Sequence, residues 1–396
     1  MRRGPLCPRV PAAGRITPTP LPALAPVLAL ALALLLALAL AGAAVPESPA
    51  RADTVTPDAA PALRFVSYNI CGNMCGAAPY DDRRRIDSVV TQAAVATWNA
   101  DQVFLQEVCR PQYDEILRRL APLGFDGSYA ATLVGRASVC GGADYGNAVL
   151  VKGPVTDSVA LDLTVGGESE PITVPCVRSL LRGRVSWACS VHLYWDDGTL
   201  AAPEAQELAS RAEAWEAQGI PVVLGGDFNH SPRTSILTHF YDPAVGDGGQ
   251  GVFLEADETD TDFFDPAVCT AGSPAGSDPL CRSGEPTWNE KKIDYVFFSA
   301  CHFTTPRGDS LPLDPLVSDH RMLRGAAAAR ADCGPLDSPA AAAPPGSPSP
   351  GLGTGPPRVG VPRPPRPRSR RSAPDRSAPT PPRRPGSGPT PGRNAA

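Results

Sequence analysis

Carboxylate, amide and imidazole side chains stand at the ends of short apolar runs throughout the middle of the sequence. Glu107 comes just after the apolar run 103–105, and Asp227 comes just after the run 222–224. A polar group at the end of a buried strand is held rigidly at one edge of its sheet, so several such ends can converge on one site. The complete set consists of Glu107, Asp227, Asp294, Asp319, Asn69, Asn147, Asn229, His192 and His320.

These residue types predict metal-assisted hydrolysis. Carboxylate and amide oxygens are hard ligands suited to Mg²⁺, Mn²⁺ or Ca²⁺, and a histidine beside a carboxylate can act as a general base or as a donor to the transition state. Asp294 interrupts the apolar strand 292–298, where a charge needs a partner, and His320 is the natural partner. The sequence contains no Gly-rich phosphate loop, Gly-x-Ser-x-Gly motif or Cys/His dyad that would favour other chemistry.

Each residue taken alone also has a purely structural interpretation. Asn69 and Asn229 could be turn formers, Glu107 could be a surface carboxylate, and His192 could be a half-buried histidine without a role. His230 directly follows the set and has no assigned role. The acidic stretch 255–265 could hold a structural Ca²⁺, but its spacing fits no known motif, which favours a solvated acidic loop.

Alternating strand and helix patterns place these residues in one fold. Strand-like segments are expected at 63–70, 102–105, 148–151, 158–163, 185–193, 221–224, 292–298 and from 322 onward, and helical spacing is expected at 82–98, 111–120 and 203–218. Many strands mixed with few helices predict a packed pair of sheets flanked by helices.

The ordered motifs resemble those of the endonuclease/exonuclease/phosphatase superfamily. Single motifs of this kind are weak, but seven in order over about two thirds of the chain are specific. The motifs are Ser67-Tyr68-Asn69, Gln106-Glu107, Tyr145-Gly146-Asn147-Ala148, Val191-His192-Leu193, Gly226-Asp227-Phe228-Asn229, Lys292-Ile293-Asp294-Tyr295-Val296 and Ser318-Asp319-His320. The resemblance implies an α/β fold of the DNase I type, a four-layer α/β/β/α sandwich of two mostly antiparallel sheets flanked by helices.

The resemblance also implies a role for each motif residue. Mg²⁺, or Mn²⁺ or Ca²⁺ in its place, would be held mainly by Glu107, helped by Asn69 and Asp319. The catalytic residues would surround the phosphate and the attacking water. Asp227 would orient or deprotonate the water, Asn229 would bond a phosphate oxygen, His320 would donate to the phosphate with Asp294 holding its imidazole, and His192 would contact the phosphate from the other side.

The sequence indicates the class of substrate less clearly than it indicates the type of reaction. The first 52 residues carry a net charge of +4 and the last 63 carry +8, so the total of −5 leaves −17 on the middle, which is unlike a general nucleic-acid binder. A local basic patch can coexist with that negative charge. The candidate substrate contacts are Asn147, Arg178 and Arg233, and Arg182 and Arg184 lie close to Arg178 in the sequence.

We therefore expect a phosphoester substrate, with nucleic acid favoured over a phospholipid headgroup. The alternatives are a sphingomyelinase-like enzyme, for which Tyr194-Trp195 could enter a membrane, and an inositol-phosphate phosphoesterase. A secreted binding protein without activity is disfavoured, because every polar position of the motifs is filled. We expect a monomer with no stable protein partner.

Composition divides the chain into three parts. Residues 1–52 read as a signal peptide, with arginines, an apolar run at 27–45 and an Ala50-Arg51-Ala52 cleavage site. Residues 53–333 form the expected catalytic domain. Residues 334–396, rich in Pro, Ala, Gly, Ser and Arg, are expected to be disordered. The protein should therefore be secreted, or membrane-anchored if the signal is not cleaved.

Cysteine usage agrees with export. Ten cysteines remain beyond Cys7, an even number that favours disulfides. Cys176 and Cys189 are symmetric about Arg182-Gly183, so a hairpin there would place them opposite each other within bridging distance. For Cys71 and Cys75 a disulfide role is favoured over a metal site, because no second ligand pair has zinc-finger spacing.

Overall fold

A computed structural model describes residues 54–72, 75, 81–136, 138–269, 280–331 and 333. The predicted signal peptide and the predicted disordered tail lie outside the described residues. Within the described part, no helix is both long enough and apolar enough to cross a membrane.

Two six-stranded sheets form the centre of the molecule. In order across the first sheet lie β11 (Phe303–Ser310), β12 (Leu323–Ala329), β1 (Leu63–Asn69), β2 (Gln102–Cys109), β4 (Tyr145–Lys152) and β3 (Phe125–Leu133). In order across the second lie β5 (Val155–Asp162), β6 (Thr173–Leu181), β7 (Arg184–His192), β8 (Val222–Asp227), β10 (Asp294–Ser299) and β9 (Phe253–Glu255). Only the pairs β1–β2 and β7–β8 are parallel among these strands.

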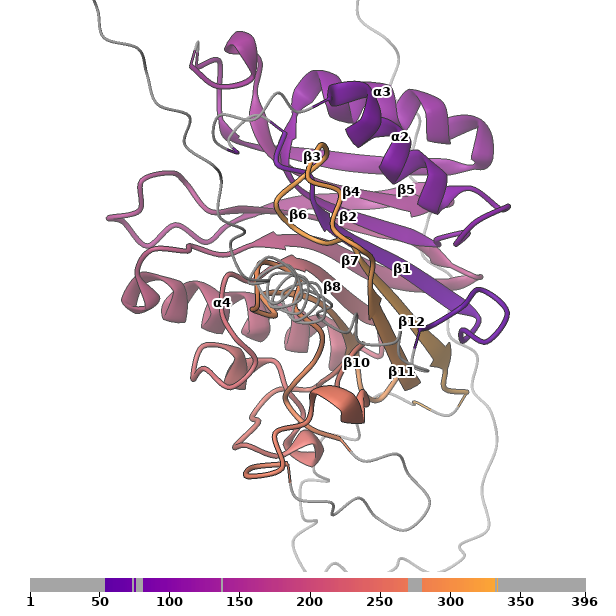
Figure 1. The fold of residues 1–396 in the computed structure, drawn as a ribbon, viewed down its shortest axis with the longest axis vertical. Helices are drawn as coiled ribbons and strands as arrows, with labels where there is room; N and C mark the ends of the chain where they lie inside the picture. Colours follow the sequence, from indigo (N-terminus) through magenta and orange to yellow (C-terminus); the bar gives the residue numbers. More distant parts are fainter. Residues whose placement is uncertain are drawn as a thin grey trace, which may run out of the picture. The chain divides into compact units, whose positions relative to one another are not determined.

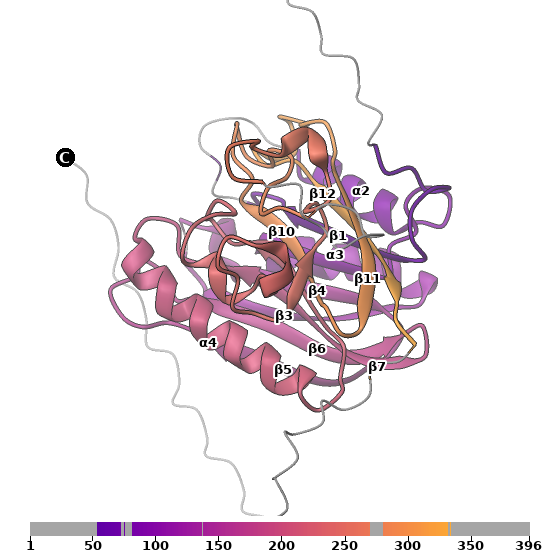
Figure 2. The ribbon, with the colours of Figure 1, turned by 90° about the horizontal axis from the view of Figure 1, so that it is seen from below.

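Among the described residues, three helices cover the outer faces of the sheets. Helices α2 (Asp82–Ala93) and α3 (Arg110–Leu120) pack on the first sheet, and α4 (Gly198–Glu216) packs on the second, as Figures 1 and 2 show. The sheets face each other, which confirms the predicted four-layer α/β/β/α sandwich. Helix α4 begins five residues before the predicted start, because Asp197 caps it by accepting from the Thr199 N–H at 2.8 Å.

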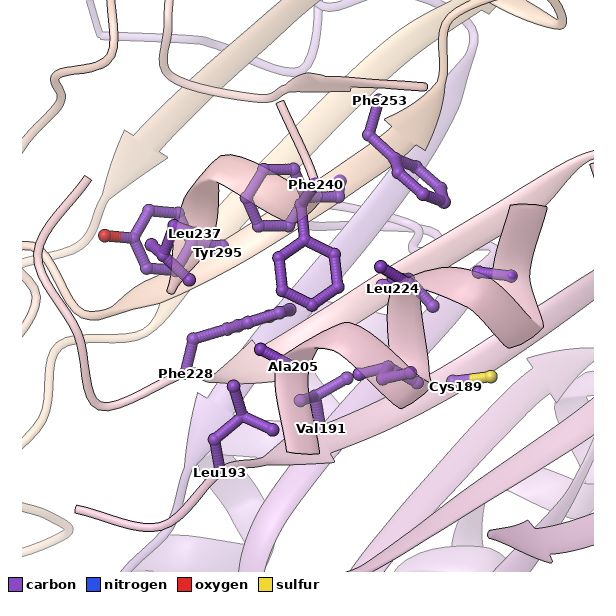
Figure 3. Close-up of a cluster of buried hydrophobic side chains, with 14 of the residues drawn as sticks. Cys189, Val191, Leu193, Ala205, Leu224, Phe228, Leu237, Phe240, Phe253 and Tyr295 are labelled. Carbon is purple, nitrogen blue, oxygen red and sulfur yellow. The ribbon is translucent and has the colours of Figure 1, made fainter. Parts of the chain in front are cut away.

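Apolar side chains fill all three gaps between the four layers. Alternate residues of each strand point to opposite faces, so a strand buried on both faces reads as a nearly continuous apolar run. In β1, Phe65 joins the core between the sheets, whereas Val66 and Tyr68 pack under α2 and α3. The core under α4, shown in Figure 3, contains Leu224 and a cluster of aromatic rings.

The two parallel pairs determine where the functional residues meet. Helix α2 connects β1 to β2, and α4 connects β7 to β8, so the carboxyl ends of both pairs lie at one edge of the sandwich. Asn69 is opposite Gln106 in one sheet, and His192 is opposite Asp227 in the other. Antiparallel β10 begins at the same edge, because Asp294 pairs with Asp227.

Close contact between the sheets near this edge requires Gly225. A Cβ atom on Gly225 would lie 2.1 Å from the ring of Phe104 in the other sheet. Gln106 donates to the Ser190 hydroxyl at 2.9 Å and joins the sheets again one step nearer the edge. The two sheets are therefore tightly packed against each other next to the edge where the predicted site residues meet.

All ten cysteines beyond Cys7 form disulfides. Cys176 and Cys189 are register partners on β6 and β7, which confirms the predicted pair. The others are Cys71–Cys75, Cys109–Cys140, Cys269–Cys281 and Cys301–Cys333. The pairing of Cys71 with Cys75 agrees with the disulfide role that the sequence favours.

The first part of the acidic stretch 255–265 is not the solvated loop that the sequence favours, whereas Asp262 and Asp265 are exposed as expected. Glu255, Asp257 and Glu258 are buried. Lys292 compensates for Glu255 and Asp257, because its Nζ lies 3.2 Å from Glu255 Oε1 and 3.5 Å from Asp257 Oδ2. Burial raises the pKa of Glu255 to about 7 against the opposing effect of Lys292. Composition shows that the stretch is acidic, but it does not show that a lysine 35 residues from Asp257 is buried with it.

Candidate active site

Alternate side chains of a strand share one face of the sheet, and this alternation brings most of the predicted residues to one place. Phe65, Ala188, Val223, Val296 and their neighbours of equal parity fill the core between the sheets. Continuing that alternation to the strand ends brings a set of polar residues to the open edge of the same gap. These are Asn69 on β1, Asn147 on β4, His192 on β7, Asp227 on β8 and Asp294 on β10.

Glu107 has the opposite parity and reaches the site through a β-bulge. The register between β2 and β4 shifts between Leu105 and Val108, and Glu107 has a φ of 58°. Bulges commonly redirect a side chain next to a functional site. Gly72 packs directly against the bulge, since its N–H donates to the Glu107 carbonyl at 2.7 Å and a Cβ would lie 2.3 Å from that oxygen.

Phe228 fixes the end of β8. Its ring is fully buried and makes edge-to-face contacts with Phe240 at 5.1 Å and Tyr295 at 5.4 Å between ring centroids (Figure 3). Asp227 and Asn229 therefore face the cleft on either side of a fully buried ring. Asn229 has a φ of 58°, and its N–H donates to Asp227 Oδ1 at 2.8 Å in a tight local turn.

Asn69 links the two sheets through its side-chain amide. Its Nδ2 donates to Glu107 Oε1 at 2.9 Å and to Asp227 Oδ2 at 3.1 Å. Its Oδ1 accepts from the Cys71 N–H at 3.0 Å. The amide oxygen is therefore turned to the backbone, so in this geometry Asn69 orients two carboxylates, whereas the sequence predicts a metal ligand.

His320 and Asp294 form the predicted pair. His320 Nδ1 lies 2.9 Å from Asp294 Oδ2, and its Nε2 lies 3.6 Å from Asp227 Oδ2. Burial alone would lower the pKa of His320, but the carboxylates of Asp294 and Asp227 outweigh it and raise that pKa to about 10. The two carboxylates therefore favour the cationic form of the imidazole, which Asp294 fixes at one ring nitrogen.

Asp227 lies between the two imidazoles. His192 Nε2 is 3.8 Å from Asp227 Oδ2, on the side away from Asp294. Burial, followed by the charge of Asp294, raises the pKa of Asp227 to about 6, while the two histidines oppose the rise. A carboxylate poised near neutrality is suited to accept a proton from water.

A cleft of about 490 Å³ opens over these groups. Among its lining residues are six of the predicted site: Glu107, His192, Asp227, Asn229, Asp319 and His320. Asn69 and Asp294 lie directly behind them, bonded to lining residues. Asn147 is buried deeper, where its Nδ2 donates to the Thr173 carbonyl at 3.0 Å and ties the sheets together.

The two predicted arginine contacts are not brought to the cleft. Arg178 pairs with Trp187 in the middle of the hairpin and shares its parity, which places it on the outer face of the second sheet. Arg233 is held by Asp247 at 3.2 Å and Asp265 at 3.1 Å. Neither arginine is among the described residues that line the cleft.

The donor set fits a hard divalent cation. Glu107 lines the cleft and is aligned by Asn69. Asp319 lines the same cleft, and its Oδ2 accepts from the Trp288 indole at 3.0 Å. Two carboxylates with further oxygens open to solvent are typical of a magnesium site, which usually keeps several waters. Glu107 and Asp319 are the two carboxylates predicted as metal ligands, and both line the cleft.

Sequence reasoning missed several residues of the cleft. They are Tyr145, Ser169, Glu170, Trp195, Trp288, Lys291 and Ile293. Tyr145, Lys291 and Ile293 lie in or beside the motifs, so their positions gave a clue to their place. Glu170 lies in the loop between β5 and β6, where no periodicity or motif indicates a role.

Comparison with known proteins agrees with this geometry. A model of the endonuclease/exonuclease/phosphatase family matches residues 66–320. The fold is similar to that of an endonuclease/exonuclease/phosphatase from Bacteroides vulgatus, with a TM-score of 0.50 and 18% identity over 68% of this chain and 99% of that chain. No curated protein is matched by sequence.

Two further solved structures are similar. The human Nocturnin catalytic domain with bound sulfate has a TM-score of 0.49 and 18% identity over 68% of this chain and 93% of that chain. A mannosyl-6-phosphatase from Bacteroides thetaiotaomicron has a TM-score of 0.47 and 16% identity over 67% of this chain and 99% of that chain.

Proposed function

Because the chain belongs to the endonuclease/exonuclease/phosphatase family, whose members are metal-dependent phosphoester hydrolases, we propose that this cleft hydrolyses phosphodiesters by in-line attack of water. The observation that carries the proposal is the position of His320, held by Asp294 next to Asp227 at the convergence of both sheets. A fixed positive donor beside a base of near-neutral pKa matches what the reaction requires.

The residues divide the work between them. Glu107 and Asp319 would hold a divalent cation, which would supply positive charge to neutralise the phosphate. Asp227 accepts the proton of the attacking water as the new P–O bond forms. His320 donates from Nε2 to a phosphate oxygen and stabilises the charge that builds as the ester oxygen leaves.

Two residues position the phosphate. Asn229 has one amide N–H bonded to the Leu193 carbonyl at 2.8 Å, which leaves the second N–H for a phosphate oxygen. His192 approaches Asp227 from the side opposite Asp294 and contacts the phosphate there. The ester oxygen takes up a proton from solvent and departs as an alcohol, and Asp227 then releases its proton to solvent.

The dependence of rate on pH follows from Asp227 and His320. We expect kcat/KM to rise as pH passes the pKa of Asp227, about 6, because the base must be ionised, and to fall as pH passes the pKa of His320, about 10. Asp294 raises both pKa values, so Asp294→Asn should move both limbs to lower pH. Rates measured from pH 4.5 to 11 test this, and an unshifted alkaline limb in the variant would contradict the role of His320.

The geometry favours a compact phosphodiester over a nucleic-acid polymer. Arg178 and Arg233 lie away from the cleft, Arg182 pairs with Asp101 at 2.7 Å, and Arg184 donates to the Arg330 carbonyl at 2.8 Å. A groove for single-stranded nucleic acid combines basic and aromatic residues. Lys291 is the one Lys or Arg among the described lining residues of this cleft.

We also propose that the protein is exported, with residues 1–52 removed and the basic residues 334–396 following the catalytic domain. Five disulfides support an oxidising compartment. Mass spectrometry of the protein from the culture medium should find a mature chain that begins at Asp53. A chain confined to the cells with Met1 intact would contradict export.

Hydrolysis assays on several substrate classes test the proposed function. The purified protein is incubated with plasmid DNA, RNA, phospholipid vesicles, inositol phosphates and small nitrophenyl phosphodiesters, in Mg²⁺ and in EDTA. We expect turnover of small phosphodiesters that EDTA abolishes and excess Mg²⁺ restores. Cleavage of DNA or RNA alone would replace the proposed substrate with nucleic acid, and turnover unaffected by EDTA would contradict the mechanism.

A further inference from the structure

The Cys71–Cys75 disulfide lies at the catalytic cleft, and the hydrolytic scheme does not use it. Both of its cysteines line the cleft, and no other disulfide does so among the described lining residues. Cys75 is only partly buried, whereas Cys176 and Cys189, which join β6 to β7, are fully buried. A reductant in solution can therefore reach the Cys71–Cys75 disulfide through the cleft.

Loss of this disulfide should disturb the fold less than loss of any other. It joins residues four apart, whereas the other four disulfides join residues 12 to 32 apart. A cross-link that closes a short loop removes little entropy from the unfolded chain, so it contributes less to stability.

Backbone hydrogen bonds that do not involve sulfur hold the same turn. The Ile70 N–H donates to the Gln106 carbonyl at 3.1 Å. The Gly72 N–H donates to the Glu107 carbonyl at 2.7 Å. Cys71 lies between these two bonds, so its backbone should stay in place when the S–S bond is broken.

Asp319 lies against this disulfide. Its Oδ1 is 3.1 Å from Cys75 Sγ, and one carboxylate oxygen and the sulfur atoms of both cysteines lie within 4.8 Å of one another. Its Oδ2 accepts from the Trp288 indole at 3.0 Å, which fixes the carboxylate. A disulfide sulfur carries no hydrogen, so in the oxidised protein it cannot donate to Oδ1. Reduction would therefore place two thiols beside a carboxylate that is already fixed.

Two thiols and a carboxylate form a donor set for a soft divalent cation. Thiolate ligands favour Zn²⁺, whereas Mg²⁺ prefers oxygen ligands. Ligand atoms around a tetrahedral zinc ion lie about 3.3–3.8 Å apart, because its bonds to oxygen and sulfur are about 2.0–2.3 Å long. The three groups are already within 4.8 Å of one another, and the cleft leaves a fourth position for water. Small side-chain rotations would therefore complete a zinc site.

We infer that Cys71, Cys75 and Asp319 bind one Zn²⁺ when the disulfide is reduced. An external dithiol supplies two electrons and two protons. One of its sulfur atoms attacks a cysteine sulfur, the S–S bond breaks, and the dithiol closes to its own disulfide as both cysteines become thiols. Zn²⁺ then displaces the two thiol protons into solvent and bonds to both thiolates and to Asp319.

The zinc site makes hydrolysis depend on the redox state of the cleft. This consequence rests on the proposed function, because Asp319 is also a predicted ligand of the hydrolytic cation and the two cations compete for it. In the export that we propose, the reduced state is that of the chain before it reaches an oxidising compartment. Zinc would then keep the hydrolase inactive until it leaves the cell.

Titration with Cd²⁺ tests the zinc site without a hydrolysis assay, because bonds between Cd²⁺ and thiolates give an ultraviolet charge-transfer band that oxygen ligands do not give. The oxidised full chain is titrated in parallel with the same protein after treatment with a water-soluble phosphine, which is then removed. Alkylation followed by mass spectrometry identifies the free thiols. We expect the band, with about one Cd²⁺ per chain, in the reduced protein only. Zn²⁺ should bind at least about 100-fold more tightly after reduction.

Three variants separate this site from the rest of the chain. Cys71→Ser/Cys75→Ser should give no band in either redox state. The matched control is Cys269→Ser/Cys281→Ser, which removes a disulfide outside the cleft with the next shortest loop and should keep the band after reduction. Asp319→Asn should keep the thiolate band but weaken Cd²⁺ binding by at least about 10-fold.

Three results would overturn the inference. The first is alkylation of Cys71 and Cys75 only under conditions that unfold the protein. The second is a folded protein in which both thiols are free and Cd²⁺ gives no band. The third is a band that persists in Cys71→Ser/Cys75→Ser.

The failure of the proposed function is distinguishable. If the oxidised protein hydrolyses no phosphodiester in Mg²⁺, the hydrolytic proposal fails, and the Cd²⁺ titration still decides the zinc site. If hydrolysis is observed, reduction in the presence of Zn²⁺ should abolish it and reoxidation should restore it. Hydrolysis that Zn²⁺ does not inhibit in the reduced protein would overturn the competition for Asp319.

Discussion

Replacing His320 by Gln lowers kcat/KM on any phosphodiester that the protein cleaves by about 10³-fold, because removing one preorganised donor from a developing oxyanion costs about 10²–10³ in rate and this donor is charged. His320 is buried, and its Nδ1 is committed to Asp294 at 2.9 Å. Only Nε2 can therefore serve the phosphate. Glutamine retains a donor of similar length but carries no charge, so hydrogen bonding alone cannot restore the rate.

Steady-state kinetics in saturating Mg²⁺ measure the effect. His239→Gln is the matched control, since His239 is a partly buried histidine in a short helical turn and does not line the cleft. Circular dichroism and thermal unfolding should show that both variants are folded. A His320→Gln variant that keeps more than a tenth of wild-type kcat/KM would contradict the assigned role.

Replacing Glu107 by Gln is expected to weaken Mg²⁺ or Mn²⁺ binding by at least about 100-fold, because loss even of an outer-shell partner typically costs 10–100-fold in affinity. The bulge and the left-handed backbone at Glu107 are independent of its side chain, so the glutamine should occupy the same position. Activity at limiting metal should fall with binding, and high metal concentrations should restore part of it.

Calorimetric titration with Mn²⁺ measures the affinity directly. Glu207→Gln, on the exposed face of α4 with only a surface contact to Arg211, is the control for removing one carboxylate from an acidic protein. Equal Mn²⁺ affinity in wild type and Glu107→Gln would place the cation elsewhere. A loss in both variants would instead indicate nonspecific binding to the acidic surface.

The site could be predicted largely because its residues end buried strands. Asp227 and Asp294 follow or begin apolar runs whose length and parity are visible in the sequence, and parity alone points both into the gap between the sheets. The same parity excludes Arg178, which alternates with Val177 and so faces outward. The prediction of Arg178 as a substrate contact relied on nearness along the chain and did not use alternation.

Edge strands and loops were harder to predict. Strands β3 and β11 lie at the two edges of the first sheet, carry Gly, Ser, Asp or Pro, and lack a clear apolar period, so the sequence did not predict them. Glu170 lies in a loop whose position depends on bonds to Tyr194 from another strand end. The burial of Glu255 similarly depends on Lys292, which is distant in sequence.

Disulfide pairing shows the same division between local and distant information. The symmetry of Cys176 and Cys189 about one turn is a local property, and the structure pairs them. The pair Cys301–Cys333 closes a loop across β11 and β12, so it depends on how those strands return through the sheet. The spacing of two cysteines about one turn is enough to predict a local disulfide. A disulfide between segments far apart in the sequence can be predicted only from the whole fold.

The central claim is that strand ends of both sheets build one metal and phosphate site, and anomalous diffraction from crystals soaked in Mn²⁺ and inorganic phosphate tests it most directly. The account predicts one Mn²⁺ within about 2.0–2.3 Å of a Glu107 carboxylate oxygen. It also predicts a phosphate within hydrogen-bond distance of His320 Nε2 in the same cleft. Mn²⁺ bound elsewhere on the chain, with neither ion in the cleft, would contradict it.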